Sequence, residues 1–205
     1  MGRIDKLKNI FSISYYKKNT RDYKDLINYD YKFNAAFRGV KSLSRKEKNS
    51  IEIKYLKCYR KCQAYRNTLW GDIAFIKLKK LSEKTGIGLN DNLNIGKGLV
   101  IGHWGRIVMN TVVEFGNEIM LTHNVTIGRD VRGKRKGSPK IGNRVCIRSN
   151  STVVGNITIG DDVLIAPNTF VNFDVPSHSI VIGNPATIHH RDNATEGHLG
   201  IVEGE

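Results

Sequence analysis

Apolar residues recur every six positions through the second half of the chain, and this spacing is its most regular feature. A glycine follows many of them, as in Ile95-Gly96 and Ile159-Gly160. A six-residue period fits neither the 3.6-residue turn of a helix nor the simple alternation of a strand. It predicts a solenoid of short strands and tight turns, in which each repeat points one aliphatic side chain inward. The twelve apolar positions are Ile95, Ile101, Met109, Phe115, Leu121, Ile127, Ile141, Ile147, Val153, Ile159, Ile165 and Val171.

The six-residue frame is interrupted at two places. Two extra residues separate the repeat of Ile101 from that of Met109, within the segment 103–106. A longer insertion, residues 129–140, holds six basic side chains and one acid, and predicts a loop. Elsewhere three hexads form one coil, so equivalent residues of successive coils should stack about 4.8 Å apart. Interruptions in repeat proteins tend to carry binding sites, because the regular coils act as scaffold.

The segment 1–85 follows other patterns. Residues 1–43 are polar, rich in tyrosine and weakly periodic, which predicts short helices joined by loops. Ser44 and Glu47 have the spacing of a capping box, and Gly86 is a helix stop. Between them we expect two helices or one bent helix over about 45–85, with the basic side solvated and the apolar side packed on the base of the solenoid. The helical spacing is carried by Ile51, Tyr55, Tyr59 and Cys62 and, beyond an interruption at Gly71, by Ile73, Phe75, Ile76, Leu78 and Leu81.

These patterns predict a β-class protein, a parallel β-helix preceded by a basic α-helical region. The expected divisions are a helical region over 1–85, a β-helix over 86–188 and a tail over 189–205. We expect Asp174-Val175-Pro176 to end the last coil, with the segment 183–186 forming a turn after it.

The positive charge is confined to the helical region. Residues 1–85 hold 22 Lys and Arg against 8 Asp and Glu, whereas residues 86–205 hold 11 of each, so the formal charge of +14 lies in the segment 1–85. Such asymmetry indicates an anionic partner for that half, such as a membrane surface, an acidic polymer or nucleic acid. The chain carries no recognisable nucleic-acid-binding motif, which disfavours the last of these.

Neither a secretory signal nor an apolar stretch long enough to span a membrane is visible. This predicts a cytoplasmic protein, with the inner face of the membrane as a candidate contact. The three cysteines are expected to be reduced. Cys58 and Cys62 lie four apart on an expected helix without further ligands at metal-binding spacing, so we expect them to pack in the core and predict no metal.

Several segments resemble the hexapeptide-repeat acyltransferases of the serine acetyltransferase type. They are residues 95–103, 105–108 and 125–128, together with the closing Gly183-Asn184-Pro185-Ala186, and the resemblance covers about residues 86–188. It implies a left-handed parallel β-helix, a homotrimer or dimer of trimers, and transfer of an acetyl group from acetyl-CoA to a hydroxyl.

Two histidines are the candidate catalytic residues. An alcohol needs a base to take its proton during attack on a thioester, and histidine suits this role because its ordinary pKa lies near neutral pH. The resemblance aligns His103, in the first interruption, with the catalytic histidine of the family. His123 follows one coil plus two residues later, so it should stack on the same edge, where it could touch the acceptor or the intermediate; an outward edge side chain is the alternative.

The family binds CoA in the groove between neighbouring solenoids, mostly through the backbone of the later coils. The aligned positions are Ser149, Ala166, Pro167, Gly183, Asn184 and Pro185. Arg148, Lys140 and the basic loop could meet the CoA phosphates. A solvated loop without such a role is an equal alternative for 129–140.

The chain departs from the family where serine would bind. Serine acetyltransferases hold the amino acid with charged residues at positions that align with Gly88, Gly102, Gly137 and Ser138, and all four are uncharged here. A zwitterionic acceptor would lack partners for its two charges. Relatives with a shorter basic front end resemble glycan O-acetyltransferases of capsule and lipopolysaccharide assembly, so we expect a cell-surface polysaccharide sugar as acceptor. Free serine, as in cysteine biosynthesis, is the alternative. A trimeric scaffold with a basic module for nucleic acid or a membrane surface is the alternative of another class.

Overall fold

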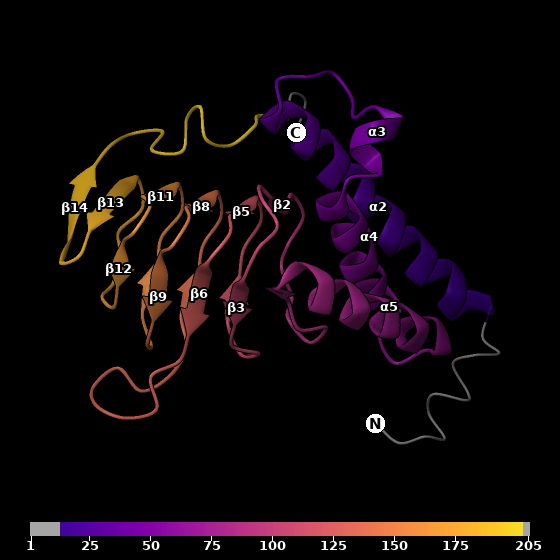
Figure 1. Ribbon diagram of the computed structural model, residues 1–205, viewed down its shortest axis with the longest axis horizontal. Helices are drawn as coiled ribbons and strands as arrows, with labels where there is room; N and C mark the ends of the chain where they lie inside the picture. Colours follow the sequence, from indigo (N-terminus) through magenta and orange to yellow (C-terminus); the bar gives the residue numbers. More distant parts are fainter. Residues whose placement is uncertain (1–12, 203–205) are drawn as a thin grey trace.

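The computed structural model describes residues 13–202, in which an α-helical region packs on one end of a parallel β-helix (Figure 1). The strands form the three faces of a prism. The helices are α2 (Ile13–Phe37), α3 (Arg45–Lys48), α4 (Ile51–Ala64) and α5 (Leu69–Thr85). Face A contains β1 (Ile87–Gly88), β3 (Ile107–Met109), β6 (Val125–Gly128), β9 (Thr152–Val154) and β12 (Phe170–Val171). Face B contains β2 (Val100–Ile101), β5 (Ile119–Leu121), β8 (Val145–Ile147), β11 (Val163–Ile165), β13 (Ser179–Gly183) and β14 (Ala186–His190). Face C contains β4 (Glu114–Phe115), β7 (Lys140–Ile141) and β10 (Thr158–Ile159).

Strand pairing confirms the coil length and both interruptions. Val145 pairs in parallel with Val163, three hexads further on. Val100 pairs with Met120 across the first interruption, and Met120 pairs with Cys146 across the loop, so both coils are longer than three hexads. The extra residues are therefore expelled at the corners, and the strands stay in register.

The repeating aliphatic residues fill the inside of the prism. All twelve positions given above are buried except Phe115, which is half-buried and still packs against the core. The corners are tight because residues at the turns take left-handed backbone conformations, as at Asn124, Asn150 and Asn168, with φ of 57°, 61° and 59°. Asparagine tolerates this region better than most residues.

The sequence-based expectation of short helices in residues 1–43 is wrong over the described part of that range. Residues 13–37 form the single helix α2, whereas residues 1–12 lie outside the described residues. Its buried face includes Asp30 and Asn34 as well as apolar side chains, so the apolar period is weak. The partners of these polar groups lie elsewhere in the chain, and only the tertiary structure supplies them.

Asp30 and Arg60 form a fully buried ion pair that joins α2 and α4 to the first coil. Arg60 Nε donates to Asp30 Oδ2 at 2.6 Å, and both side chains have no exposed surface. Asp30 Oδ1 also accepts hydrogen bonds from the backbone N–H groups of Gly98 and Leu99 at 2.8 and 3.0 Å. The guanidinium in turn donates to the carbonyl of Ile95 at 2.6 Å. The helical region is thereby fixed to the solenoid by charges whose hydrogen bonds offset their burial.

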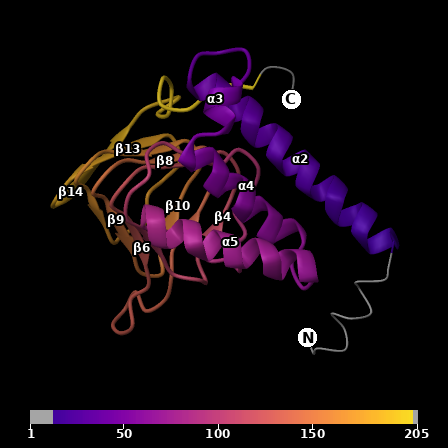
Figure 2. The same ribbon diagram turned by 45° about the vertical axis from the view of Figure 1, so that its right-hand side comes forward.

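The structure confirms the capping box of Ser44 and Glu47, but the box starts only the one-turn helix α3. Two longer helices follow, α4 capped by Ser50 and α5, instead of a helix that runs on from residue 45. The break falls at residues 65–68 rather than at Gly71, because Thr68 caps α5. A Cβ at Gly71 would lie 2.2 Å from the carbonyl oxygen of Tyr65, so this glycine lets the two helices approach. Figure 2 shows α4 lying between α2 and α5.

The expected apolar face of the second helix is only partly buried. Leu78 and Ala74 lie in the core, and Cys58 and Cys62 of α4 are buried there too, as expected. Ile73, Phe75 and Ile76 are instead exposed, because only one narrow stripe of α5 faces α4 and the first coil. Among the described residues no helix is both long and apolar enough to cross a membrane.

The C-terminal part differs from expectation. The segment 174–176 does not end the coil, because β13 stacks in parallel on β11 and then forms an antiparallel hairpin with β14. The chain beyond β14 returns along face B to α2, as Figure 1 shows in yellow. There Leu199 packs with outward-facing residues of face B, among them Met120 and Cys146. This tail therefore covers apolar side chains that the six-residue pattern leaves outside the prism.

Candidate active site

Both candidate histidines lie on one corner of the prism, where strands of face B lead into strands of face A. His103 lies between β2 and β3, and His123 lies one coil further on, between β5 and β6. Their rings stand edge to face with centroids 5.8 Å apart. The expectation that they stack on the same edge is confirmed.

Two glycines let the first interruption fold closely against the next coil. Gly105 has a φ of 146°, and a Cβ there would lie 2.7 Å from the Cβ of His123. A Cβ at Gly102 would lie 2.7 Å from the Cε of Met120, a flexible end that could move. The two extra residues of this coil come after His103 and fold closely over His123 instead of forming a free loop. His103 is exposed, and His123 is half-buried beneath it.

Most of the residues predicted to bind CoA continue the same corner through the later coils. The N–H of Asn150 donates to the carbonyl of His123 at 3.3 Å, and the N–H of Asn168 donates to that of Ser149 at 3.0 Å. Gly183 N–H donates to the hydroxyl of Thr169 at 3.1 Å, at the end of β13 where the chain turns back into β14. The corner therefore forms one continuous edge from His103 to the end of β13. Arg148, Ser149, Ala166, Pro167, Gly183, Asn184 and Pro185 all lie on it.

Lys140 is the one predicted residue that does not lie on this corner. It begins β7 on face C, where its ammonium lies 3.4 Å from a carboxylate oxygen of Glu114, and both side chains are largely exposed. The basic loop leaves the prism between faces A and C, below β6 in Figure 1. Asp130 and Gly137 exchange two backbone hydrogen bonds of 2.9 and 3.0 Å across its base. Within one chain, then, neither Lys140 nor the loop lies on the corner that carries the histidines.

The C-terminal tail reaches the outside of face B beside Arg148. Burial, followed by the positive charges of Arg148 and Arg191, lowers the pKa of His198. Burial also raises the pKa of the Cys146 thiol to about 11, so this thiol stays neutral under the tail. Arg148 thus lies on the corner of the predicted CoA positions and also acts electrostatically on His198 of the tail.

Three asparagines on this corner escaped the sequence reasoning. Asn124, Asn150 and Asn168 occupy equivalent turn positions, and the side-chain amide of Asn124 donates to that of Asn150 at 3.0 Å. Each asparagine lies two residues before the paired positions Thr126, Thr152 and Phe170 of β6, β9 and β12. The stacking of these strands therefore identifies the three asparagines as equivalent. Trp104, half-exposed directly after His103, was also passed over. The sequence alone shows a tryptophan next to a candidate base, and the structure adds that the ring is exposed.

Of the four uncharged positions that align with the serine-binding residues of the family, only one lies on this corner. Gly102 precedes His103 on the corner, whereas Gly88 lies in β1 on face A, opposite Val108. Gly137 and Ser138 lie in the basic loop, and the Ser138 hydroxyl donates to the side-chain oxygen of Asn110 at 3.4 Å. Within the part of the chain that the structure describes, no group of three or more His, Cys, Asp or Glu is placed to hold a metal ion.

Comparison with known proteins agrees with this architecture. Residues 138–172 match the family model "Bacterial transferase hexapeptide (six repeats)". Serine acetyltransferase of Helicobacter pylori is 34% identical over 137 residues, covering 67% of this chain and 80% of that protein. Serine acetyltransferase 2 of Arabidopsis thaliana is 36% identical over 147 residues, covering 68% of this chain but 45% of that protein. A solved serine acetyltransferase in complex with CoA shares the fold, with a TM-score of 0.69 at 23% identity over 85% of this chain and 72% of that one.

The chain belongs to the hexapeptide-repeat transferases, in their serine acetyltransferase-like branch. Its fold is accordingly a left-handed parallel β-helix with a helical region before it. The chain spans a little under half the length of the plant relatives that it matches.

Proposed function

We propose that this protein is an acetyl-CoA-dependent O-acetyltransferase in which His103 is the general base. The observation that carries the proposal is the pair of His103 and His123 at the corner of the first interruption, from which the predicted CoA positions continue. The relatives with this architecture are serine acetyltransferases.

The exposed imidazole of His103 is suited to the chemistry. One ring nitrogen takes the proton of the acceptor hydroxyl as its oxygen attacks the thioester carbonyl of acetyl-CoA. The resulting tetrahedral intermediate collapses with cleavage of the C–S bond, and the imidazolium returns the proton to the sulfur. The products are the acetyl ester and free CoA. His123 acts as a positioning residue, because its half-buried ring contacts that of His103 edge to face.

We place CoA along the corner that runs from His103 to Pro185. Backbone groups and the side chains of Arg148 and Ser149 would contact it there. Lys140 and the basic loop lie on another corner, so they reach a CoA only if a neighbouring chain presents them. The proposal therefore requires a trimer or a dimer of trimers, with each site between two chains. Sedimentation of an active species tests this requirement, and an active monomer would contradict it.

The relatives favour L-serine as the acceptor. The sequence alone favoured a polysaccharide sugar, with serine as the alternative, and the comparisons support the alternative better. The relatives named above give the sugar no support. L-serine is accordingly the first acceptor to test.

A sugar hydroxyl remains a second candidate on one local observation. Gly102 leaves no charge beside His103 for the ammonium of an amino acid, and Trp104 offers a half-exposed indole at the same place. An indole ring provides a flat apolar surface with little conformational entropy to lose. The apolar face of a pyranose ring fits such a surface better than serine does.

A side-by-side assay decides between these acceptors. Purified protein is given one concentration of acetyl-CoA with L-serine, with isolated anionic surface glycans, or with neither, and free CoA is measured. Saturable acetylation of L-serine supports the serine assignment, and transfer to a glycan alone supports the sugar. If acetyl-CoA neither binds nor reacts with any hydroxyl acceptor, the enzyme proposal is wrong and a trimeric scaffold remains.

A further inference from the structure

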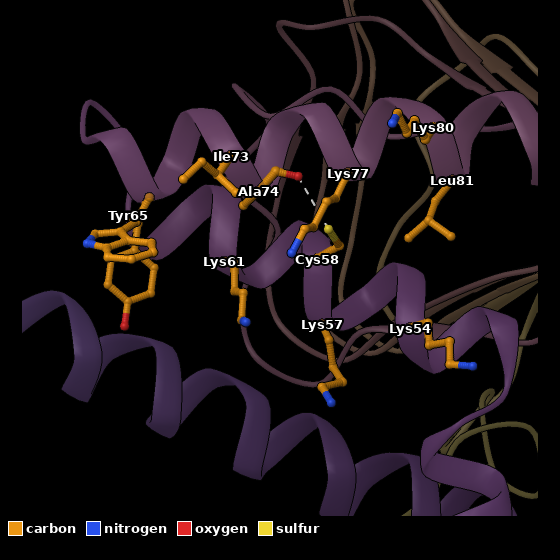
Figure 3. A pocket seen from close by; sticks show the side chains of 11 residues that line it. Lys54, Lys57, Cys58, Lys61, Tyr65, Ile73, Ala74, Lys77, Lys80 and Leu81 are labelled. Atoms are coloured by element: carbon orange, nitrogen blue, oxygen red, sulfur yellow. Dashed lines mark hydrogen bonds between the residues drawn. The ribbon is translucent and has the colours of Figure 1, made fainter.

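The helical region carries a groove that the proposed chemistry does not use. It lies between α4 and α5 and encloses about 750 Å³. Figure 3 looks into it and shows lysines from both helices around the opening. It lies on the helical end of the molecule, whereas the histidine corner lies along the β-helix, so this groove is a different site.

The floor and one wall of the groove are apolar. Cys58, Ala74 and Leu81 lie at its base, and Trp70 and Ile73 form a wall. The Cys58 thiol donates to the carbonyl of Ala74 at 3.3 Å, and burial raises its pKa, so the floor carries no charge at neutral pH. A ligand that reaches this floor must bring apolar surface.

The rim of the groove is strongly basic. Lys54, Lys57 and Lys61 recur at helical spacing along α4, and Lys77 and Lys80 face them from α5. No acidic residue lines the groove among the residues described. Lys61 also lies over the ring of Tyr23, 5.7 Å from its centroid, and this uncharged ring adds no negative charge to the rim. The rim therefore favours an anionic ligand.

The apolar wall continues out of the groove onto the surface of α5. Leu69, Trp70 and Ile76 expose 51%, 58% and 57% of their surface, and Ile73 lies between them on the same side of the helix. Three large apolar side chains exposed within two turns form a patch rather than scattered surface residues. Lysines beside such a patch can lay their alkyl chains on it while their ammonium groups remain in water.

We propose that this groove and the adjoining face of α5 bind the surface of an anionic lipid bilayer. Phosphates of the lipid headgroups would meet the lysine rim, and acyl chains would cover Trp70, Ile73 and Ile76. Tryptophan and lysine beside aliphatic residues are the composition of helices that lie in the membrane interface. Each lysine close to an anionic surface adds about a fivefold gain in affinity.

Two other occupants fit less well. A two-fold contact with a second copy would set the five lysines of one groove against the same five of the other. Nucleic acid would satisfy the lysines but would leave Leu69, Ile73 and Ile76 without apolar partners, because phosphates and sugars dominate its contacts. An anionic bilayer supplies both chemistries at once. Cyclic symmetry in the proposed trimer also sets three grooves at one end, where their weak contacts act together.

The first test is sedimentation of the full-length protein with vesicles of phosphatidylcholine, with or without phosphatidylglycerol. The protein should bind only the anionic vesicles and should dissociate as salt rises. Lys54→Gln with Lys57→Gln and Lys77→Gln should weaken binding by about a hundredfold. The matched control, Lys24→Gln with Lys41→Gln and Lys46→Gln, removes the same charge from exposed lysines outside the groove and should weaken binding much less. Equal losses in the two triple variants would contradict a site at the groove.

The second test reports on the apolar wall. Trp70 and Trp104 are the two tryptophans of the chain, so Trp104→Phe leaves Trp70 as the only indole. Its emission should shift to the blue on anionic vesicles and should be quenched by lipids brominated on their acyl chains. A shift only in the Trp70→Phe variant would place the contact at Trp104 and overturn the proposal. The proposal would also fail if the wild-type protein does not bind vesicles and a groove variant changes the sedimenting mass of the free protein. That result would identify a second copy as the occupant.

Discussion

The imidazole rings of His103 and His123 stand edge to face, with centroids 5.8 Å apart. Their contact follows from strand register, because Ile101 pairs with Leu121 and each histidine comes two residues after its member of that pair. The two extra residues of the first interruption come after His103, before Ile107 pairs with Val125, so they leave this register unchanged. The exposed ring is open to a substrate, and the half-buried ring below limits its orientation.

His103→Ala should lower kcat by about 10²–10⁴, the usual effect of losing a general base, with acetyl-CoA affinity nearly unchanged. His123→Ala should cost much less, because that ring positions the base without taking the proton. Steady-state kinetics with a titration of acetyl-CoA binding measures both effects. His190→Ala, an exposed histidine of β14, is the control. Near-normal turnover of the His103 variant would show that another group is the base.

Gly102→Asp should lower the KM for L-serine by several-fold, if serine is the acceptor. A carboxylate next to His103 would attract the serine ammonium, and charge-assisted hydrogen bonds are the stronger kind. A Cβ at Gly102 would start 2.7 Å from the Cε of Met120 and 3.1 Å from the Cγ2 of Thr122, so both side chains must shift to admit it. Gly102→Asn has nearly the same shape without the charge and should leave KM high. Equal KM values for the two variants would show that the ammonium does not lie beside this residue.

Arg60→Met should lower the free energy of unfolding by about 3–5 kcal/mol, because it leaves the Asp30 carboxylate buried without its cation. The control is Lys140→Met, which removes an exposed ion pair with Glu114 and should cost about 0–1 kcal/mol. Urea unfolding at one fixed protein concentration compares the two variants, because assembly would change the apparent stability. Similar losses in both would mean that the buried pair contributes little.

The C-terminal tail should loosen in acid through Asp162. Burial alone would raise the pKa of this carboxyl, but hydrogen bonds from Thr195, His178 and Ala194 outweigh it and hold the pKa below its usual range. A carboxyl with a lowered folded-state pKa stabilises fully above its unfolded pKa of about 3.9, and this stabilisation is lost as the pH falls through the folded value. The protection factors of residues 194–200, which correct for the intrinsic pH dependence of exchange, should therefore fall below about pH 4. Asp162→Asn should show fast exchange at neutral pH as well, and slow exchange in that variant would rule out this anchor.

The sequence by itself determined the β-helix. The period of six, its two interruptions and the glycines beside them fixed the coils, because each repeat meets only its neighbours and local pattern decides such a fold. The same pattern placed His103 and His123 on one edge, whereas the positions from Ser149 to Pro185 came from the resemblance to the family. The capping box and Gly86 marked helix ends for the same local reason.

Only the tertiary structure decided what happens at the two ends of the prism. The length of α2 depends on Asp30 and Asn34, whose partners Arg60, Gly98 and Leu99 lie far along the sequence. The tail depends on Asp162, which receives hydrogen bonds from Ala194 and Thr195, well beyond the last coil. The exposure of Trp70 and Ile76 likewise depends on which stripe of α5 the neighbouring helix covers. A buried polar group is stable only beside its partner. A local sequence pattern cannot identify a partner that lies tens of residues away in the chain.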